Sequence, residues 1–96
     1  MGLPARVRVV RQAQVPQGPT RQRTLALAGA DREVLEEMLD TPGCSVALAL
    51  AGSTLVGCAA RTGQELVVAV ALEWRKRGIE EQLLAAVRPV GDPAGR

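Results

Sequence analysis

The basic turn Trp74-Arg75-Lys76-Arg77-Gly78 contains the residues whose types and spacing most directly suggest binding chemistry. It follows an apolar stretch from Leu66 to Leu72 and precedes an amphipathic stretch that ends near Val87. A strand, a basic loop containing glycine and a helix, in this order, direct backbone N–H groups toward an anion. The sequence therefore predicts an anion-binding turn, although a solvated basic turn without a ligand accounts for the same residues equally well.

The composition restricts acid–base and nucleophilic chemistry. The chain has no His, Tyr or Phe, and Trp74 is its only aromatic residue. An imidazole base, a His-containing metal site and a Tyr proton donor are excluded, so any proton transfer depends on Asp, Glu, Cys, Lys, the chain termini or water. Cys58 lies in an apolar run, and no residue suited to act as its base accompanies it, which favours a core residue over a nucleophile. We predict no metal site.

The size and charge of the chain indicate one small domain of 96 residues. Twelve Lys and Arg against ten Asp and Glu give a net charge of +2, which by itself does not indicate a nucleic-acid partner. Two cysteines do not suggest a disulfide scaffold, and the chain has neither a signal-peptide pattern nor an apolar run of about 18 residues. We expect a soluble cytoplasmic protein without a membrane partner, a single domain over residues 1–96 with loose ends at 1–5 and 90–96.

The first half of the chain predicts one strand and one helix. Alternating Arg and Val residues predict a strand from Arg6 to Gln14. Two prolines and a glycine predict a loop from Val15 to Arg23. Thr24 to Gly29 is compatible with either a short helix or an irregular segment. A helix is expected from Asp31, as its N-cap, to Asp40, with its core face formed by Val34, Leu35, Met38 and Leu39.

The second half predicts three strands and a helix. The strands are expected at Ser45–Ala51, Thr54–Ala60 and Leu66–Leu72, and their short connections make them an antiparallel meander. Both faces of these strands are apolar, so the sheet should be covered on two sides. The helix should begin near Arg77 or Gly78 and bury Ile79, Leu83, Leu84 and Val87. The fold class is therefore α+β: a mixed, mostly antiparallel sheet of about four strands with two or more helices.

The residues from Val68 to Leu84 resemble the central motif of the Gcn5-related N-acetyltransferase (GNAT) family. That motif is a strand ending in Val-x-Pro-Glu-aromatic, then Arg-Gly-x-Gly-x-Gly/Ala, then a Leu-rich helix. Here the corresponding residues are Val70-Ala71-Leu72-Glu73-Trp74, then Arg75-Lys76-Arg77-Gly78-Ile79-Glu80, then Leu83-Leu84. The upstream order of elements is similar too, so the resemblance extends from Arg6 to about Pro89. It describes a short acetyltransferase-like chain without the C-terminal strand and helix of that family.

The resemblance implies that the chain binds acetyl-CoA as a co-substrate and transfers the acetyl group to an amine acceptor. Glu65, at the start of the motif strand, is the carboxylate placed like the family's occasional general base, and its simpler interpretation is a turn residue. The implied cofactor-binding residues follow the strand edge and the turn: Val68, Ala69, Val70, Arg75, Lys76, Arg77, Gly78, Ile79, Glu80 and Glu81.

Two positions of the motif differ from the family pattern. Lys76 stands where the family often has Gly, and Glu80 stands where it has Gly or Ala. A carboxylate about 5 Å from a phosphate charge costs roughly 3 kcal/mol at an effective dielectric constant near 20 and under about 1 kcal/mol in water. Acidic residues in a first helical turn also stabilise the helix, which explains Glu80 and Glu81 without a ligand.

Two other classes of function stay open at this point. The chain could be a degenerate, non-catalytic acetyltransferase-fold module whose motif-strand edge pairs with a partner chain or a second copy of itself. It could also bind nucleic acid through Arg6, Arg8, Arg21, Arg23 and the basic turn. The lack of aromatic stacking residues argues against binding to a single strand.

Overall fold

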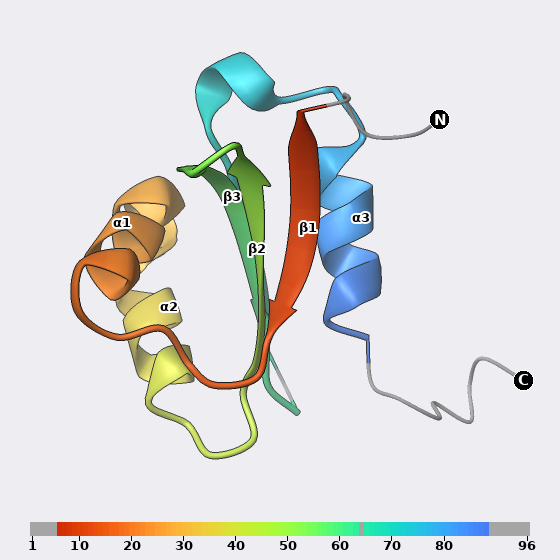
Figure 1. The fold of residues 1–96 in the computed structure, drawn as a ribbon. Helices are drawn as coiled ribbons and strands as arrows, with labels where there is room; N and C mark the ends of the chain where they lie inside the picture. Colours follow the sequence, from red (N-terminus) through yellow and green to blue (C-terminus); the bar gives the residue numbers. More distant parts are fainter. Residues whose placement is uncertain (1–5, 64, 89–96) are drawn as a thin grey trace, which may run out of the picture.

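Four strands form one antiparallel sheet in the computed structural model, which describes residues 6–63 and 65–88 (Figure 1). Each strand pairs with the next one in the chain, so the predicted meander is confirmed and every pairing in the described sheet is antiparallel. Its strands are β1 (Val7–Gln12), β2 (Ser45–Ala51), β3 (Thr54–Arg61) and β4 (Leu66–Val70). The connections at Gly52-Ser53 and at residues 62–65 are too short for a parallel crossover, which explains the antiparallel pairing of β2 with β3 and of β3 with β4.

Helices cover both faces of the sheet, as the two-sided apolar pattern predicts (Figure 1). One face carries α1 (Gly18–Ala28) and α2 (Arg32–Leu39), which are joined by the short 3-10 helix η1 (Gly29–Asp31). The other face carries α3 (Ile79–Ala86). The chain reaches α3 from β4 through a second 3-10 helix, η2 (Leu72–Trp74), and the bend at residues 75–78. The fold is therefore α+β, as expected.

The α3 face is closely packed where Leu83 meets Gly57 on β3. Ile79, Leu83 and Val87 are buried in this layer, and Leu84 is half-buried, so the predicted core stripe of the helix is largely correct. A β-carbon at Gly57 would lie 3.1 Å from Leu83 Cδ1 and 3.3 Å from the Ala69 carbonyl oxygen. Gly57 therefore allows α3 to approach the sheet where β3 pairs with β4.

The opposite core layer lies under α1 and α2 and includes Cys58. Its buried residues come from both helices and from the sheet: Leu25, Leu35, Met38, Leu39, Val46, Leu48, Cys58, Ala60 and Val67. Thr24 is also buried, and its hydroxyl donates a hydrogen bond to the Thr20 carbonyl oxygen at 2.7 Å. Because this bond satisfies the hydroxyl within the helix, the polar residue can lie in the core.

The prediction of a loop from Val15 to Arg23 is wrong, because α1 begins at Gly18. Pro19 lies in the first turn of the helix, where the missing N–H would have no intrahelical acceptor. Thr24 to Ala28, which the sequence left undecided, is the second half of the same helix. The apolar pattern concealed the helix because only Thr24 and Leu25 are buried along it.

Three smaller expectations also need correction. Asp31 directly precedes α2, but its side chain makes no capping hydrogen bond, because η1 runs into the helix and leaves Asp31 without the extended conformation of an N-cap. Val34 is 38% exposed, since the buried face of α2 consists of Leu35, Met38 and Leu39. Strand β4 ends at Val70, and Leu72 lies in η2 with 76% of its surface exposed.

Two further points concern membrane-spanning helices and the two ends of the chain. No helix in the described ranges has the length and apolar character needed to cross a membrane. The segments 1–5 and 90–96, which the sequence predicts to be loose, lie outside the described residues.

Candidate functional site

The outer edge of β4 presents backbone groups for pairing. Ala71 N–H donates to the Val56 carbonyl oxygen at 2.8 Å, and β4 continues this antiparallel ladder with β3. Hydrogen-bonding direction alternates along a strand, so Ala69 and Ala71 face β3 while Val68 and Val70 face outward. Since β4 is the last strand of the described sheet, Val68 and Val70 offer backbone groups at this edge, and Ala69, also predicted to contact the cofactor there, has no outward-facing backbone groups.

The bend that follows η2 contains two residues in the left-handed region. Lys76 has φ 62° and Gly78 has φ 82°, and Gly78 directly precedes α3. Left-handed backbone is unfavourable for a side chain such as that of Lys76, which explains why a glycine at this position suits the motif better. Arg75, which precedes Lys76, is extended, with φ −73° and ψ 159°, so anion binding at the bend depends on the backbone amides at the start of α3.

The N–H groups of residues 76–81 make no hydrogen bond within the described parts of the chain. The first amide of this region that is engaged is that of Gln82, which donates to the Gly78 carbonyl oxygen at 3.3 Å. Upstream, the amides of Trp74 and Arg75 donate to the carbonyl oxygens of Ala71 and Leu72, at 2.8 Å and 3.3 Å. The bend and the first turn of α3 therefore have N–H groups available to bind an anion, and the helix dipole strengthens the attraction between these groups and the anion.

Two of the three basic side chains in the turn fold back onto the protein. Arg75 Nε donates to the Val70 carbonyl oxygen at 3.1 Å. Arg77 Nε donates to the Glu73 carbonyl oxygen at 3.3 Å, and its guanidinium lies 5.4 Å from the centre of the Trp74 ring. This cation–π contact, together with the packing of Trp74 on the α3 core layer, fixes the shape of the turn.

The first three residues of α3 differ in whether their side chains can reach a ligand at the predicted site. Ile79 is buried in the core, so only its backbone is available to a ligand. Glu80 and Glu81 are exposed in the first helical turn. Their carboxylates stabilise the helix end through its dipole and, at the same time, oppose an anion bound to the same amides.

Glu65 lies at the opposite end of β4 from the basic bend. Its N–H donates to Thr62 Oγ1 at 3.1 Å and its carbonyl oxygen accepts from Thr62 N–H at 2.9 Å, which closes the β3–β4 turn. Its side chain is exposed. These bonds agree with the simpler interpretation of a turn residue, and a catalytic role for the carboxylate stays a prediction.

Cys58 is a core residue, with 1% of its surface exposed. Burial raises the pKa of its thiol to about 12, and the side chain contacts the Thr24 carbonyl oxygen at 3.9 Å. The thiolate is the nucleophilic form of cysteine, so Cys58 is not suited to attack a substrate. Within the described residues no group of His, Cys, Asp or Glu could hold a metal ion.

A thiol reagent should therefore modify Cys44 in the native protein and leave Cys58 unmodified. Cys44 is half-buried, whereas Cys58 becomes accessible only on unfolding. Because the pKa of Cys58 is higher in the folded than in the unfolded state, stability should also fall as pH rises from about 9 toward 12. Mass spectrometry after maleimide labelling, with and without urea, measures the modification of Cys44 and Cys58. Labelling of Cys58 in the native state would contradict the assignment.

The sequence pattern did not indicate a hollow between α1 and the β2–β3 turn. It has a volume of about 490 Å³ and is lined by Arg23, Ala26, Leu27, Ser53, Thr54 and Leu55. These residues come from two distant segments, which only the packing of α1 brings together. It is separate from the bend and from the edge of β4.

Several solved structures are similar to this chain in fold, whereas no family model and no curated protein matches it. An aminoglycoside acetyltransferase from an uncultured soil metagenomic sample is 20% identical, with a TM-score of 0.60 over 84% of this chain and 66% of the other. A GNAT family acetyltransferase from Elizabethkingia anophelis, with acetyl-CoA bound, is 21% identical, with a TM-score of 0.61 over 88% of this chain and 56% of the other. An aminoglycoside N-acetyltransferase in complex with CoA is 17% identical, with a TM-score of 0.57.

The chain thus spans between about half and two thirds of the length of these acetyltransferases. At such identities the likeness shows a common fold. The acetyltransferase-like fold that the sequence suggested is confirmed.

Proposed function

We propose that this chain, which has the fold of GNAT acetyltransferases, binds acetyl-CoA along β4 and at the bend before α3, and donates the acetyl group to an amine. One observation carries the proposal. The backbone N–H groups of residues 76–81, in the bend and at the start of α3, make no hydrogen bond within the described chain. Donors of this kind suit the diphosphate of CoA. The acetyl-CoA and CoA bound in two of the similar structures support the same assignment.

The pantetheine arm would lie along the outer edge of β4. Val68 and Val70 present N–H and carbonyl groups in the direction away from β3, and an extended chain of amides can pair with them. With a rise of about 3.3 Å per residue, the five steps from Glu65 to Val70 span about 17 Å. A thioester bound with its diphosphate at the bend therefore points its acyl end toward the Glu65 end of the strand.

The reaction would be direct attack of the amine on the thioester carbonyl. The C–N bond forms, the C–S bond breaks, the CoA thiolate leaves, and the amine loses a proton. Glu65 is the carboxylate that we assign to accept this proton, through its exposed side chain at the start of β4. Water is left to protonate the thiolate, because the chain has neither Tyr nor His.

Acetyl-CoA is expected to stabilise the folded chain. A ligand present at 100 times its dissociation constant should add about 2.7 kcal/mol to the free energy of unfolding. Isothermal titration calorimetry gives the dissociation constant, and thermal unfolding with increasing acetyl-CoA gives the stabilisation. The absence of both heat and thermal shift at millimolar acetyl-CoA would refute the proposal.

Two glycines provide a matched pair of variants for this test. Gly78 and Gly43 have nearly the same left-handed backbone, with φ 82° and 83°, but Gly43 lies in the turn after α2. Replacing either by alanine introduces the same backbone strain, of about 1 kcal/mol. Only Gly78→Ala should weaken acetyl-CoA binding, so equal losses in both variants would indicate a general effect of instability.

A second candidate function is a non-catalytic module that associates with a partner chain or with itself. The outward edge of β4 favours it, because Leu66 and Leu72, at the two ends of this edge, are 47% and 76% exposed. An exposed edge strand with apolar neighbours is a template for adding another strand. Light scattering without ligand distinguishes a monomer from such an assembly.

A further inference from the structure

We infer that Arg75 is a specificity residue that makes β4 prefer ligands carrying a diphosphate over diphosphate-free pantetheine. The inference rests on the proposed function, since it concerns the same edge and the same bend. In the structure the Arg75 side chain covers part of this site. Its basis is the hydrogen bond between Arg75 Nε and the Val70 carbonyl oxygen.

The Val70 carbonyl is one of the groups that an incoming chain needs. It faces outward, because the adjacent Ala71 N–H donates to Val56 on β3 and the direction of hydrogen bonding alternates along the strand. Arg75 occupies this acceptor at 3.1 Å. An amide N–H of pantetheine can pair with Val70 in good geometry only after the guanidinium has moved, or by sharing the acceptor with it.

The 3-10 helix η2 places Arg75 over the end of the strand. Trp74 N–H and Arg75 N–H donate to the carbonyl oxygens of Ala71 and Leu72, which turns the chain back toward Val70 within five residues. Arg75 itself is exposed, so its guanidinium can leave the carbonyl without crossing the core. The contact is therefore both well defined and reversible.

A diphosphate gives the displaced guanidinium a new partner. Arg75 is the first residue of the bend and lies next to Lys76, where the amides without a partner begin, so its long side chain can turn from the strand edge to an anion held there. An Arg–phosphate contact is charge-assisted and is stronger than the bond to a neutral carbonyl. Pantetheine alone competes with Arg75 for the Val70 carbonyl and offers the guanidinium no new partner, whereas CoA supplies one.

The test compares CoA and pantetheine as ligands of the wild-type chain and of two variants, Arg75→Ala and Arg75→Met. Met keeps the aliphatic stem without the donor, so it serves if Ala disturbs the turn. We expect both variants to bind pantetheine about tenfold more tightly and CoA no more tightly than wild type. Tenfold corresponds to 1.4 kcal/mol. Calorimetry measures CoA binding, and NMR shift titration measures pantetheine binding.

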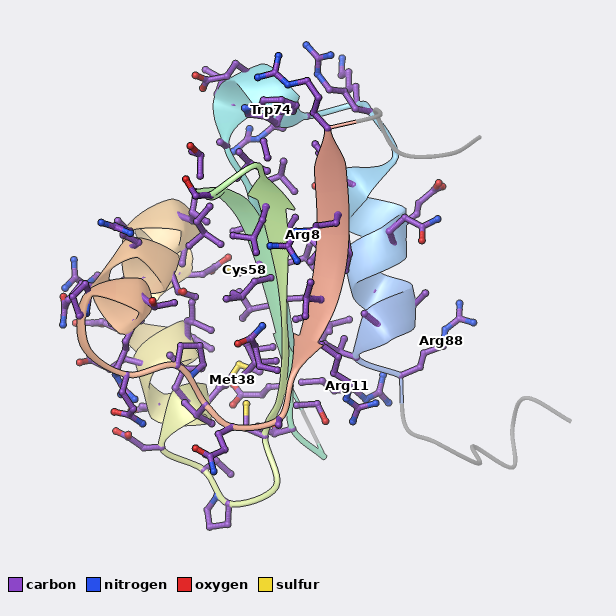
Figure 2. The ribbon with its side chains drawn as sticks, viewed as in Figure 1. Arg8, Arg11, Met38, Cys58, Trp74 and Arg88 are labelled. Atoms are coloured by element: carbon purple, nitrogen blue, oxygen red, sulfur yellow. The ribbon has the colours of Figure 1, made fainter. Side chains whose placement is uncertain are left out.

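Arg88→Gln is the control for the loss of one positive charge. Arg88 follows α3 at the end remote from the bend, and Figure 2 shows it far from Trp74. This variant should leave the ratio of the two dissociation constants unchanged. If Arg75→Ala and Arg75→Met change both ligands by the same factor, the inference fails while the proposed function stands. If wild type binds neither ligand, both fail.

Discussion

Replacing Leu83 by alanine should lower the free energy of unfolding by about 2–5 kcal/mol, the range for large-to-small changes in a packed core. Leu83 is fully buried at the centre of α3, and its Cδ1 lies 3.1 Å from where a β-carbon of residue 57 would be. Gly57 has no side chain that could move into the vacated space. The cavity should therefore persist, and because a small domain has only about 5–15 kcal/mol of stability, the loss should be large.

Urea unfolding followed by circular dichroism measures this loss, and Leu72→Ala is the matched control. Leu72 lies in η2, just before the bend, and is 76% exposed, so its truncation should change stability by no more than about 0.5 kcal/mol. Similar values for the two variants would mean that α3 is not anchored on β3 in the manner described. Acetyl-CoA binding should also weaken in Leu83→Ala, because α3 positions the amides of the bend.

The part of the sheet formed by β2, β3 and β4 was predictable because its two connections are short and its turns carry clear residue signals. Gly52 has φ 64° in the β2–β3 turn, which fits the preference for glycine at that position. Helix α1 was not predictable by the same means. It begins with Gly18-Pro19, which suggests a loop, and it buries only Thr24 and Leu25, so its apolar residues have no helical stripe.

Parts of the candidate site depend on features that the pattern of residue types does not contain. The sequence identified the bend and the outward edge near Val68 and Val70, because strand, basic turn and helix succeed one another along the chain. It could not predict that β4 ends at Val70 and that η2 returns Arg75 to the Val70 carbonyl. Leu72 continues the apolar run, a pattern that predicts a strand, whereas the structure places it in an exposed 3-10 turn.

Replacing Glu80 by glycine should tighten CoA binding by about tenfold, which corresponds to about 1.4 kcal/mol. Glu80 is exposed in the first turn of α3, close to the amides that we assign to the diphosphate. Repulsion at about 5 Å amounts to roughly 3 kcal/mol at an effective dielectric constant near 20 and to under about 1 kcal/mol in water, so an exposed carboxylate falls between these limits. Calorimetric titration at low salt measures the change, and added salt should reduce it.

The control for this variant is Glu33→Gly, which removes a carboxylate from the first turn of α2, away from the bend. Both changes place glycine in a first helical turn and raise the net charge by one, so they should cost similar stability. Only Glu80→Gly removes a charge beside the amides of residues 76–81. If the two variants bind CoA with the affinity of wild type, the diphosphate does not lie at the start of α3. If both tighten binding equally, the attraction depends on net charge rather than on this turn.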